Sequence, residues 1–392
     1  MPVSAAADAR QRVRLAALSL GQVVSWGILY YALIVAAPEI ASATGWPLVA
    51  VTAAFSGGLV VSAITGVVVG RLLDERGPRI VMTAGSAIGA AGLVIVALAP
   101  DLLVFAAGWL VCGLAQSAVL YQAAFTVITR RYGERRHAPL TVLTLAGGLA
   151  STVFAPVVAL LLGLLDWRGT FLVLAGVLAV VTVPVHWGSL ERSWAHLPER
   201  HHAEPAHTIS GVIRTRRFWL LELTMVMLTV ALLSATLAAV PLFMEKGLTF
   251  ELAAVGLGLI GAGQVIGRLI FLVRPRSAPP WVTVVAIAVL AGISLAALAA
   301  VPGPQWLLIG IGIVAGAVRG AYTLVQASAV ADRWGTRNYG SINGAFAAPI
   351  TIAAALTPAI GPAVAAGVGS FSVMVAIMAG AAFAAVVTAR LT

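Results

Sequence analysis

The chain has 392 residues, of which 60% are hydrophobic and 10% charged, and its formal net charge is +10. A soluble domain carries roughly 25% charged residues, so this composition excludes a water-soluble globular protein and makes the lipid bilayer the solvent. In a soluble protein the basic excess would suggest nucleic-acid binding. Here the arginines lie between apolar runs, which is a membrane-topology pattern, and no nucleic-acid partner is expected.

The apolar runs predict the helices of the fold. A spanning helix needs about 20 mostly apolar residues, and the first run is too long for the core of a signal peptide. A polar loop, 188–216, separates two groups of six spans. The sequence therefore predicts an all-α membrane protein with an N-terminal six-helix bundle (1–187), a central loop and a C-terminal six-helix bundle (217–392). The twelve predicted spans are 15–37, 48–70, 79–99, 102–129, 138–163, 168–187, 217–242, 250–273, 281–301, 304–330, 340–364 and 367–390.

The distribution of basic residues predicts the orientation. With the N-terminus inside, 21 of the 24 Lys and Arg residues fall in inner loops and tails. The outer loops hold only Arg168 and Lys246, and Arg319 lies within a span. Positively charged loops stay on the cytoplasmic side. We therefore expect a multi-pass plasma (inner) membrane protein with both termini and the central loop in the cytoplasm.

The two halves share sequence features in the same register. Residues 129–135 read Thr-Arg-Arg-Tyr-Gly-Glu-Arg, and 331–337 read Ala-Asp-Arg-Trp-Gly-Thr-Arg. Their offset of about 202 also brings Pro156 onto Pro358. Two parallel six-helix repeats are a known transporter design, with the cargo site near the membrane midplane.

A dense charge cluster between the second and third spans carries a family resemblance. Residues 70–79 read Gly-Arg-Leu-Leu-Asp-Glu-Arg-Gly-Pro-Arg. This stretch resembles the signature loop of the major facilitator superfamily, Gly-x-Leu-x-Asp-Arg-x-Gly-Arg-Arg. With twelve spans and a central loop, the resemblance covers essentially the whole chain. It implies a secondary transporter that works by alternating access and is not an enzyme.

The signature loop predicts a conformational latch made of Gly70, Asp74, Arg76, Gly77 and Arg79. A carboxylate at a helix end in a membrane protein is costly unless paired. Arginines of the same loop and helix dipoles can pair with Asp74. The alternative is an ordinary solvated loop, because glycines at helix ends also suit plain turns.

A charged residue inside the tenth span is the main candidate for cargo binding. The superfamily resemblance implies that spans one, four, seven and ten line the central cavity. Arg319 lies about halfway along span ten, and Tyr322 and Gln326 share its helix face. Its repeat counterpart in span four is Gln116. An arginine fork suits a carboxylate or phosphate, although a structural arginine bonded to backbone carbonyls is the alternative.

The first span adds a second set of candidates. Gln22, Trp26 and Tyr30 lie on one helix face, and aromatic side chains with polar tips suit the wall of a small-molecule site. Ordinary helix packing explains the same pattern equally well.

Glu222, near the start of span seven, is a candidate for proton coupling. The alternative is a helix-start acid paired with neighbouring arginines. No cofactor or metal is implied, since the histidines of the central loop lack the fixed ligand spacing of a metal site. These are His196, His201, His202 and His207.

The first span and residues 45–47, Gly-Trp-Pro, resemble the monocarboxylate and oxalate–formate branch of the superfamily. That branch commonly carries an arginine in helix eight, about where this chain has Gln264. The resemblance implies a small organic anion as cargo, carried by a protein expected to be a monomer. A drug or small-molecule efflux antiporter and a non-transporting membrane sensor remain the alternatives.

Overall fold

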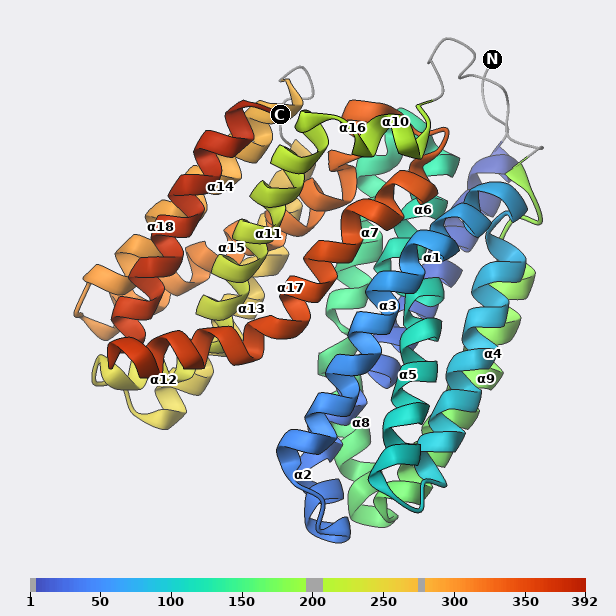
Figure 1. Cartoon of the computed structure of the whole chain (residues 1–392), viewed down its shortest axis with the longest axis horizontal. Helices are drawn as coiled ribbons and strands as arrows, with labels where there is room; N and C mark the ends of the chain where they lie inside the picture. The colour runs from blue at the N-terminus through green and yellow to red at the C-terminus, as the bar shows by residue number, and fades with distance from the viewer. Residues whose placement is uncertain (1–4, 195–206, 274–278) are drawn as a thin grey trace. The chain divides into compact units, whose positions relative to one another are not determined.

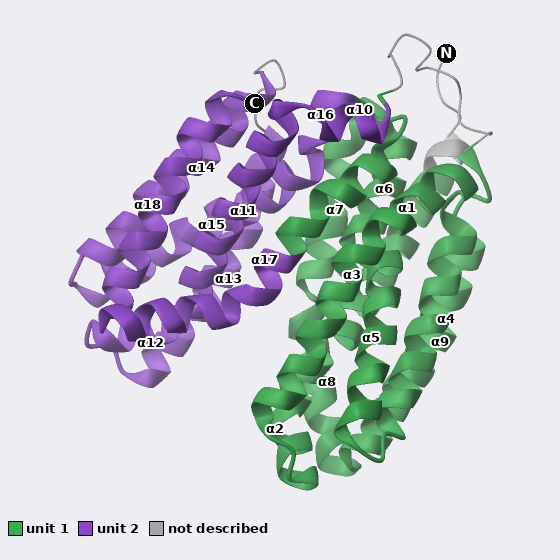
Figure 2. Cartoon of the chain, viewed as in Figure 1, with its two compact units in different colours: residues 1–207, 335–351 green, residues 208–334, 352–392 purple. Residues whose placement is uncertain are grey.

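The computed structural model of the chain describes residues 5–194, 207–273 and 279–392, and every regular element in these ranges is a helix (Figure 1). Contacts divide the chain into two compact units (Figure 2). Unit 1 comprises 1–207 with 335–351, and unit 2 comprises 208–334 with 352–392.

Unit 1 holds the first half of the helices and the beginning of α17. Its elements are α1 (Ala5–Trp26), the π-helical turn η1 (Gly27–Tyr31), α2 (Ala32–Thr44), α3 (Leu48–Arg76), α4 (Pro78–Ala97), α5 (Leu102–Val119), α6 (Tyr121–Tyr132), the 3₁₀ turn η2 (Gly133–Arg136), α7 (His137–Gly148), α8 (Ala150–Leu164) and α9 (Trp167–Ser189).

Unit 2 holds the second half. Its elements are α10 (Ile209–Ile213), α11 (Arg216–Leu237), α12 (Ala239–Glu245), α13 (Phe250–Val273), α14 (Pro280–Ala300), α15 (Gln305–Ala329), α16 (Ala331–Trp334), the remainder of α17 (Tyr339–Val368) and α18 (Phe371–Arg390).

Local sequence explains where the helices begin and end. Asp101 and Asp166 accept backbone N–H groups three residues ahead and start α5 and α9. Between α3 and α4, Gly77 has a φ of 77° and Pro78 is the first residue of the next helix. Together they turn the chain within one residue.

Eleven helical stretches of the described chain are long and apolar enough to cross a membrane. One of them, 102–164, is 63 residues long, and the basic turn η2 lies at its middle. Divided at η2, this stretch supplies the fourth and fifth predicted spans. The prediction of an all-α protein with about twelve spans is confirmed.

The two units repeat the same helix-packing pattern. In unit 1, α3 packs on α5, α4 on both α5 and α9, and α1 on α9. In unit 2, α13 packs on α15, α14 on both α15 and α18, and α11 on α18. Helices that correspond in the repeat therefore have corresponding neighbours, as expected of two copies of one helical design.

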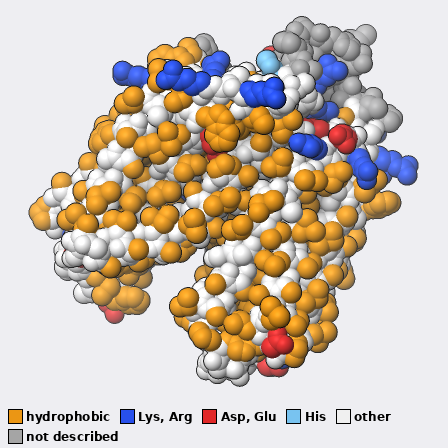
Figure 3. Space-filling model, viewed as in Figure 1, with side chains coloured by type: hydrophobic (Ala, Val, Ile, Leu, Met, Phe, Trp, Pro, Cys, Tyr) orange, Lys and Arg blue, Asp and Glu red, His pale blue; other side chains and the backbone are white. Residues whose placement is uncertain are grey.

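Charged and apolar side chains are segregated along each unit. On the face shown in Figure 3, Lys and Arg gather at one end of each unit and hydrophobic side chains cover the long helix surfaces. Apolar surface along the spans and basic residues at their ends match the requirements of a bilayer.

The boundary between the units differs in one place from the predicted domain limits. Residues 335–351, which the sequence places in the C-terminal bundle, belong to unit 1 by their contacts. This assignment agrees with the hydrogen bonds that the first turn of α17 donates to the carboxylate of Asp74 on α3. Helix α17 begins in unit 1 and continues from Ile352 in unit 2.

Candidate functional site

In unit 1, the first span contains a π-helical turn that is stabilised by a glutamine. The Gln116 Nε2 on α5 donates to the Leu29 carbonyl of η1 at 2.8 Å. π-turns within α-helices occur frequently at functional sites. The structure thus brings Gln116, a predicted site residue, directly to the irregular part of the first span.

Gln22 on α1 bonds in turn to α5, the helix that carries Gln116. Its Nε2 donates at 2.6 Å to the carbonyl of Val119, at the break between α5 and α6. Both glutamine side chains are buried, and the Oε1 atom of each has no hydrogen-bond partner among the described residues. The amide N–H groups of Gln22 and Gln116 thus bond to backbone carbonyls at irregular points of helices. Their Oε1 atoms have no hydrogen-bond partner among the described residues.

The predicted aromatic face is present and includes a residue that the sequence analysis missed. The Trp26 ring lies 5.1 Å from that of Tyr30 and 4.8 Å from that of Tyr121 on α6. The Tyr121 hydroxyl donates to the Thr144 carbonyl at 3.2 Å. Trp26 Nε1 is buried without a hydrogen-bond partner in the described ranges. Trp26 and Tyr30 are half-buried, so this cluster combines an apolar wall with one unused donor.

In unit 2, Tyr322 forms hydrogen bonds with α11. Its hydroxyl donates to the Met225 carbonyl at 2.8 Å and lies 2.7 Å from the Thr229 hydroxyl. The side chain is 6% exposed. Tyr322 therefore joins α15 to α11, and its hydrogen bonds go to that helix.

Glu222 lies one helical turn before Met225 on α11 and is buried, with 3% of its surface exposed. Neither carboxylate oxygen has a hydrogen-bond partner among the described residues, and no ion pair involves it in this part of the chain. The alternative of a helix-start acid paired with nearby arginines is therefore wrong. Charged groups are rarely buried in membrane segments without a partner.

Arg319 is half-buried on α15, and Gln326 is half-buried further along the same helix. The adjacent Gly320 lies in backbone contact with Gln264 of α13. Gly320 therefore lets the α15 backbone approach that of α13 closely, one residue after Arg319.

The carboxylate of Asp74, at the end of α3, binds the first turn of α17. Its Oδ1 accepts from the Gly340 N–H at 3.1 Å, and its Oδ2 accepts from the N–H and hydroxyl of Ser341 at 2.6 and 2.8 Å. An anion at a helix N-terminus satisfies free N–H groups and the helix dipole. Asp74 therefore caps a helix that lies about 265 residues later in the sequence.

The arginine nearest Asp74 comes from another helix. Arg130 of α6 lies 3.9 Å from the Asp74 carboxylate. The expectation that arginines of the signature loop itself pair with Asp74 is wrong, because Arg76 is exposed and Arg79 donates to the Leu190 carbonyl at 2.9 Å. Arg76 is the last residue of α3, and Gly77 turns the chain at a positive φ before Arg79.

The segment that follows α9 covers this cluster. Trp194 Nε1 donates to the Leu73 carbonyl at 2.7 Å, and the Arg130 guanidinium lies 5.1 Å from the Trp194 ring. Glu191 forms ion pairs with Arg14 at 2.7 Å and with Arg131. Residues 190–194 thereby tie α1, α3 and α6 together at the arginine-rich end of unit 1.

A family comparison agrees with this geometry. Residues 18–304 match the model of the Major Facilitator Superfamily, which covers well over half of the chain. The chain belongs to the major facilitator superfamily. It is therefore a multi-pass membrane transporter and not an enzyme.

Known proteins similar to this superfamily member support the fold. The "Uncharacterized 38 kDa protein in 23S RNA operon" of Thermoproteus tenax is 27% identical over 325 residues, 81% of this chain and 80% of that protein. A crystal structure of the E. coli fucose:proton symporter FucP has a TM-score of 0.72 at 16% identity, covering 97% of this chain and 98% of FucP. A FucP structure in the outward conformation has a TM-score of 0.71, also at 16% identity, covering 96% and 98%. At this identity the similarity establishes the fold alone.

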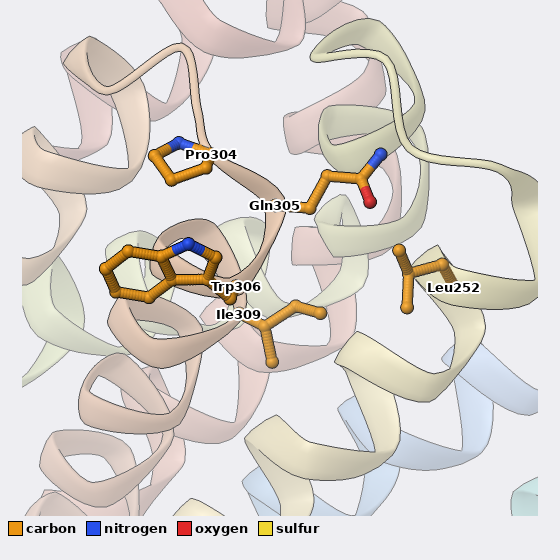
Figure 4. A pocket seen from close by; sticks show the side chains of 5 residues that line it. All are labelled: Leu252, Pro304, Gln305, Trp306 and Ile309. Atoms are coloured by element: carbon orange, nitrogen blue, oxygen red, sulfur yellow. The ribbon is translucent and has the colours of Figure 1, made fainter.

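One surface hollow in unit 2 of the transporter is not a cargo site. It is lined by Leu252, Pro304, Gln305, Trp306 and Ile309 at the beginnings of α13 and α15 (Figure 4). The lining holds no charged group, and Trp306 is 74% exposed. A tryptophan at the end of a spanning helix is typical of the membrane interface, so we assign this hollow to the lipid-facing surface.

Sequence reasoning missed several residues of these clusters, among them Tyr121, Arg130 and Ser341. Arg130 belongs to a basic run that the repeat comparison did detect, but as a helix end. Nothing in the sequence near Ser341 indicates its bond to Asp74, since the two residues are far apart in the chain. Of the histidines in the central loop, His196, His201 and His202 lie outside the described residues. Within the described ranges no group of three His, Cys, Asp or Glu side chains could hold a metal ion.

Proposed function

We propose that this protein is a secondary transporter that moves a small organic anion, a carboxylate, across the membrane together with a proton. The observation that carries the proposal is Arg319, a guanidinium partway along the spanning helix α15. Arginine keeps its proton under all physiological conditions, and its planar fork matches the two oxygens of a carboxylate.

The cost of burial favours a bound anion at Arg319. A charge at the centre of the bilayer costs roughly 2.5–3.5 kcal/mol on insertion scales and usually faces protein or a water-filled cavity. A carboxylate cargo that binds the guanidinium offsets part of this cost. The resemblance of the first span and of residues 45–47 to the monocarboxylate and oxalate–formate branch supports a carboxylate cargo.

Glu222 supplies the proton site of the proposed cycle. A charged carboxylate without a partner is very unfavourable inside a membrane protein, so a side chain that is 3% exposed and has no partner among the described residues is expected to hold a proton in this conformation. Exchange of that proton with water would couple transport to the pH gradient. FucP, a protein of the same fold, is a fucose:proton symporter.

The remaining predicted residues take separate roles. We assign Trp26 and Tyr30 to cargo contacts in unit 1. We assign Gln116 to support of the π-turn in the first span, and Gln22 to support of the break between α5 and α6. Tyr322 holds α15 against α11 about one helical turn after Glu222. The bonds of Asp74 to the first turn of α17 serve as the latch, which opens and closes as the transporter alternates between its two accessible states.

Uptake into proteoliposomes tests the proposal. A panel of radiolabelled organic acids is offered with and without an inward pH gradient. We expect a carboxylate to accumulate only with the gradient, and Arg319→Ala to abolish this accumulation. Transport of a cation or a neutral sugar instead, unaffected by Arg319→Ala, would reject the anion assignment.

A further inference from the structure

Two rows of side chains on neighbouring helices of unit 2 (Figure 2) meet at one pair of hydroxyl groups. The row on α11 has the spacing i, i+3, i+7 and consists of Glu222, Met225 and Thr229. The row on α15 begins with Arg319 and Tyr322 at i and i+3. Such spacings place each row on one face of its helix. One row thus contains the proposed proton site, and the other contains the proposed anion site.

Hydrogen bonds join the two rows at Tyr322. The Tyr322 hydroxyl donates to the Met225 carbonyl at 2.8 Å. A hydroxyl has one proton to donate, so the Thr229 hydroxyl, 2.7 Å away, donates to Tyr322. Both side chains are buried. Buried polar groups are costly to leave without partners, so a movement of α11 at this point should carry α15 with it.

The joined hydroxyls lie between the proton site and the anion site. Helix α11 forms the seventh span and α15 the tenth, so the two helices cross the membrane in opposite directions. Glu222 precedes Met225 by three residues, and Arg319 precedes Tyr322 by three. At roughly 1.5 Å per residue, each interval is about 4.5 Å along its helix. Glu222 and Arg319 therefore lie on opposite sides of the hydroxyl pair along the two helices.

The ionisable groups around Glu222 form no ion pair with it. Helices α10, α12, α14, α15 and α18 pack against α11, and α16 contacts it through the rings of Trp334 and Phe218. On these helices and on α11 itself the ionisable residues are Arg216, Arg217, Glu245, Arg319, Tyr322, Asp332, Arg333 and Arg390. Among the described residues none of them makes an ion pair with Glu222. Any link from Glu222 to the cargo arginine therefore runs through the contact between the helices.

We propose that Tyr322 and Thr229 are positioning residues that couple the proton site on α11 to the anion site on α15. This inference rests on the proposed function, since it joins the two sites assigned there. Loss of the proton from Glu222 leaves a charge buried in a spanning helix, which favours a shift of α11 that brings the carboxylate to water or to a partner. The hydroxyl pair passes this shift to α15 and so moves Arg319. Coupling of this kind is a free energy shared by two separate sites.

A double-mutant cycle tests the coupling without any cargo. Glu222→Gln and Arg319→Gln are made alone and together in the full-length protein, and Tm is measured in detergent at pH 6 and pH 9. Substitutions at independent sites have additive effects. We expect the two shifts in Tm to deviate from additivity by about 3 °C at pH 9. The deviation should be smaller at pH 6, because glutamine resembles the protonated carboxyl group.

Removal of either hydroxyl should abolish the deviation. Tyr322→Phe and Thr229→Val, each made in every member of the cycle, should restore additivity at both pH values, whereas Thr229→Ser keeps the hydroxyl and should keep the deviation. Thr236→Val is the matched control on α11, since the Thr236 hydroxyl bonds to the Leu232 carbonyl of its own helix at 2.7 Å. It should also keep the deviation. If Tyr322→Phe does not fold, Thr229→Val decides.

Two results would overturn the proposal. One is additivity in the parent at pH 9, and the other is a deviation that survives Thr229→Val. Because the cycle contains no anion, its outcome is separate from that of the uptake experiment. A parent that accumulates a carboxylate but shows additive effects would lose only the coupling role of the hydroxyl pair. A parent that transports no anion would lose the cargo assignment, whatever the cycle shows.

Discussion

The Oδ2 atom of Asp74 accepts the backbone N–H of Ser341 at 2.6 Å, which caps the first turn of α17 with a carboxylate from α3. The same carboxylate also accepts the Ser341 hydroxyl and the Gly340 N–H. A group that binds three donors at a helix end is well placed to control whether that helix stays attached. This relationship leads to the first prediction.

Asp74→Asn should lower the rate of transport by about tenfold while changing cargo affinity by less than about twofold. The amide loses the negative charge that interacts with the helix dipole and with Arg130, and the change acts on a conformational equilibrium. Initial uptake rates and equilibrium binding measure the two effects. Glu75→Gln, an exposed neighbour, is the control. Wild-type turnover in Asp74→Asn would show that the latch is not functional.

Arg319→Lys should weaken cargo binding by about tenfold, and Arg319→Ala should abolish it. Lysine keeps the positive charge but lacks the bidentate fork. Isothermal titration with the transported anion measures both variants, and size-exclusion chromatography shows that each is folded. Normal affinity in Arg319→Ala would make this arginine structural.

Glu222→Gln should uncouple transport from the pH gradient. Glutamine resembles the protonated carboxyl group but cannot release a proton. The variant should therefore exchange labelled for unlabelled cargo across the membrane but fail to accumulate cargo against its gradient. Glu251→Gln, an exposed glutamate of the same unit, should behave as wild type. Gradient-driven accumulation in Glu222→Gln would rule out Glu222 as the proton site.

Glu245 should stabilise the beginning of α18 in a pH-dependent way. Although burial acts to raise its pKa, hydrogen bonds from Ser372 and Ser370 and from the Phe371 N–H lower that pKa from 4.5 to about 2. Since the folded state favours the ionised form, the stabilisation is complete above about pH 4.5 and is lost as the pH falls toward 2.

Glu245→Gln should accordingly lower the free energy of unfolding by about 1 kcal/mol at pH 7, as for other lost helix caps. Thermal unfolding in detergent measures the difference in Tm between the two proteins, which should shrink between pH 4.5 and pH 3. A difference that does not depend on pH would contradict the charge-based explanation.

The orientation predicted from the basic residues places the central loop in the cytoplasm. In a Cys112→Ala background, Ser210→Cys should not react with a membrane-impermeant maleimide in intact cells, whereas Ser42→Cys should react. Both serines are exposed in the structure, so accessibility depends on the side of the membrane. Rapid labelling of Ser210→Cys from outside would reverse the topology.

The sequence alone was sufficient for the spans, the repeat and the family. Each of these depends on patterns of about 20 neighbouring residues or on a motif such as 70–79. The bilayer enforces the helical pattern locally, because a spanning helix satisfies all of its backbone hydrogen bonds within one segment. The same local reasoning identified Gln22, Gln116 and Trp26 as polar or aromatic residues within apolar helices.

Only the tertiary structure decided what these residues contact. The partners of Asp74 include Ser341 and Arg130 but not the arginines beside it. Among the described residues Glu222 has no hydrogen-bond partner, despite the two arginines that precede it in the chain. The physical reason is that hydrogen bonds and backbone contacts depend on which helix faces which, and residues far apart in sequence meet there. Hydropathy shows that a helix crosses the membrane but carries no information about which neighbour each face meets.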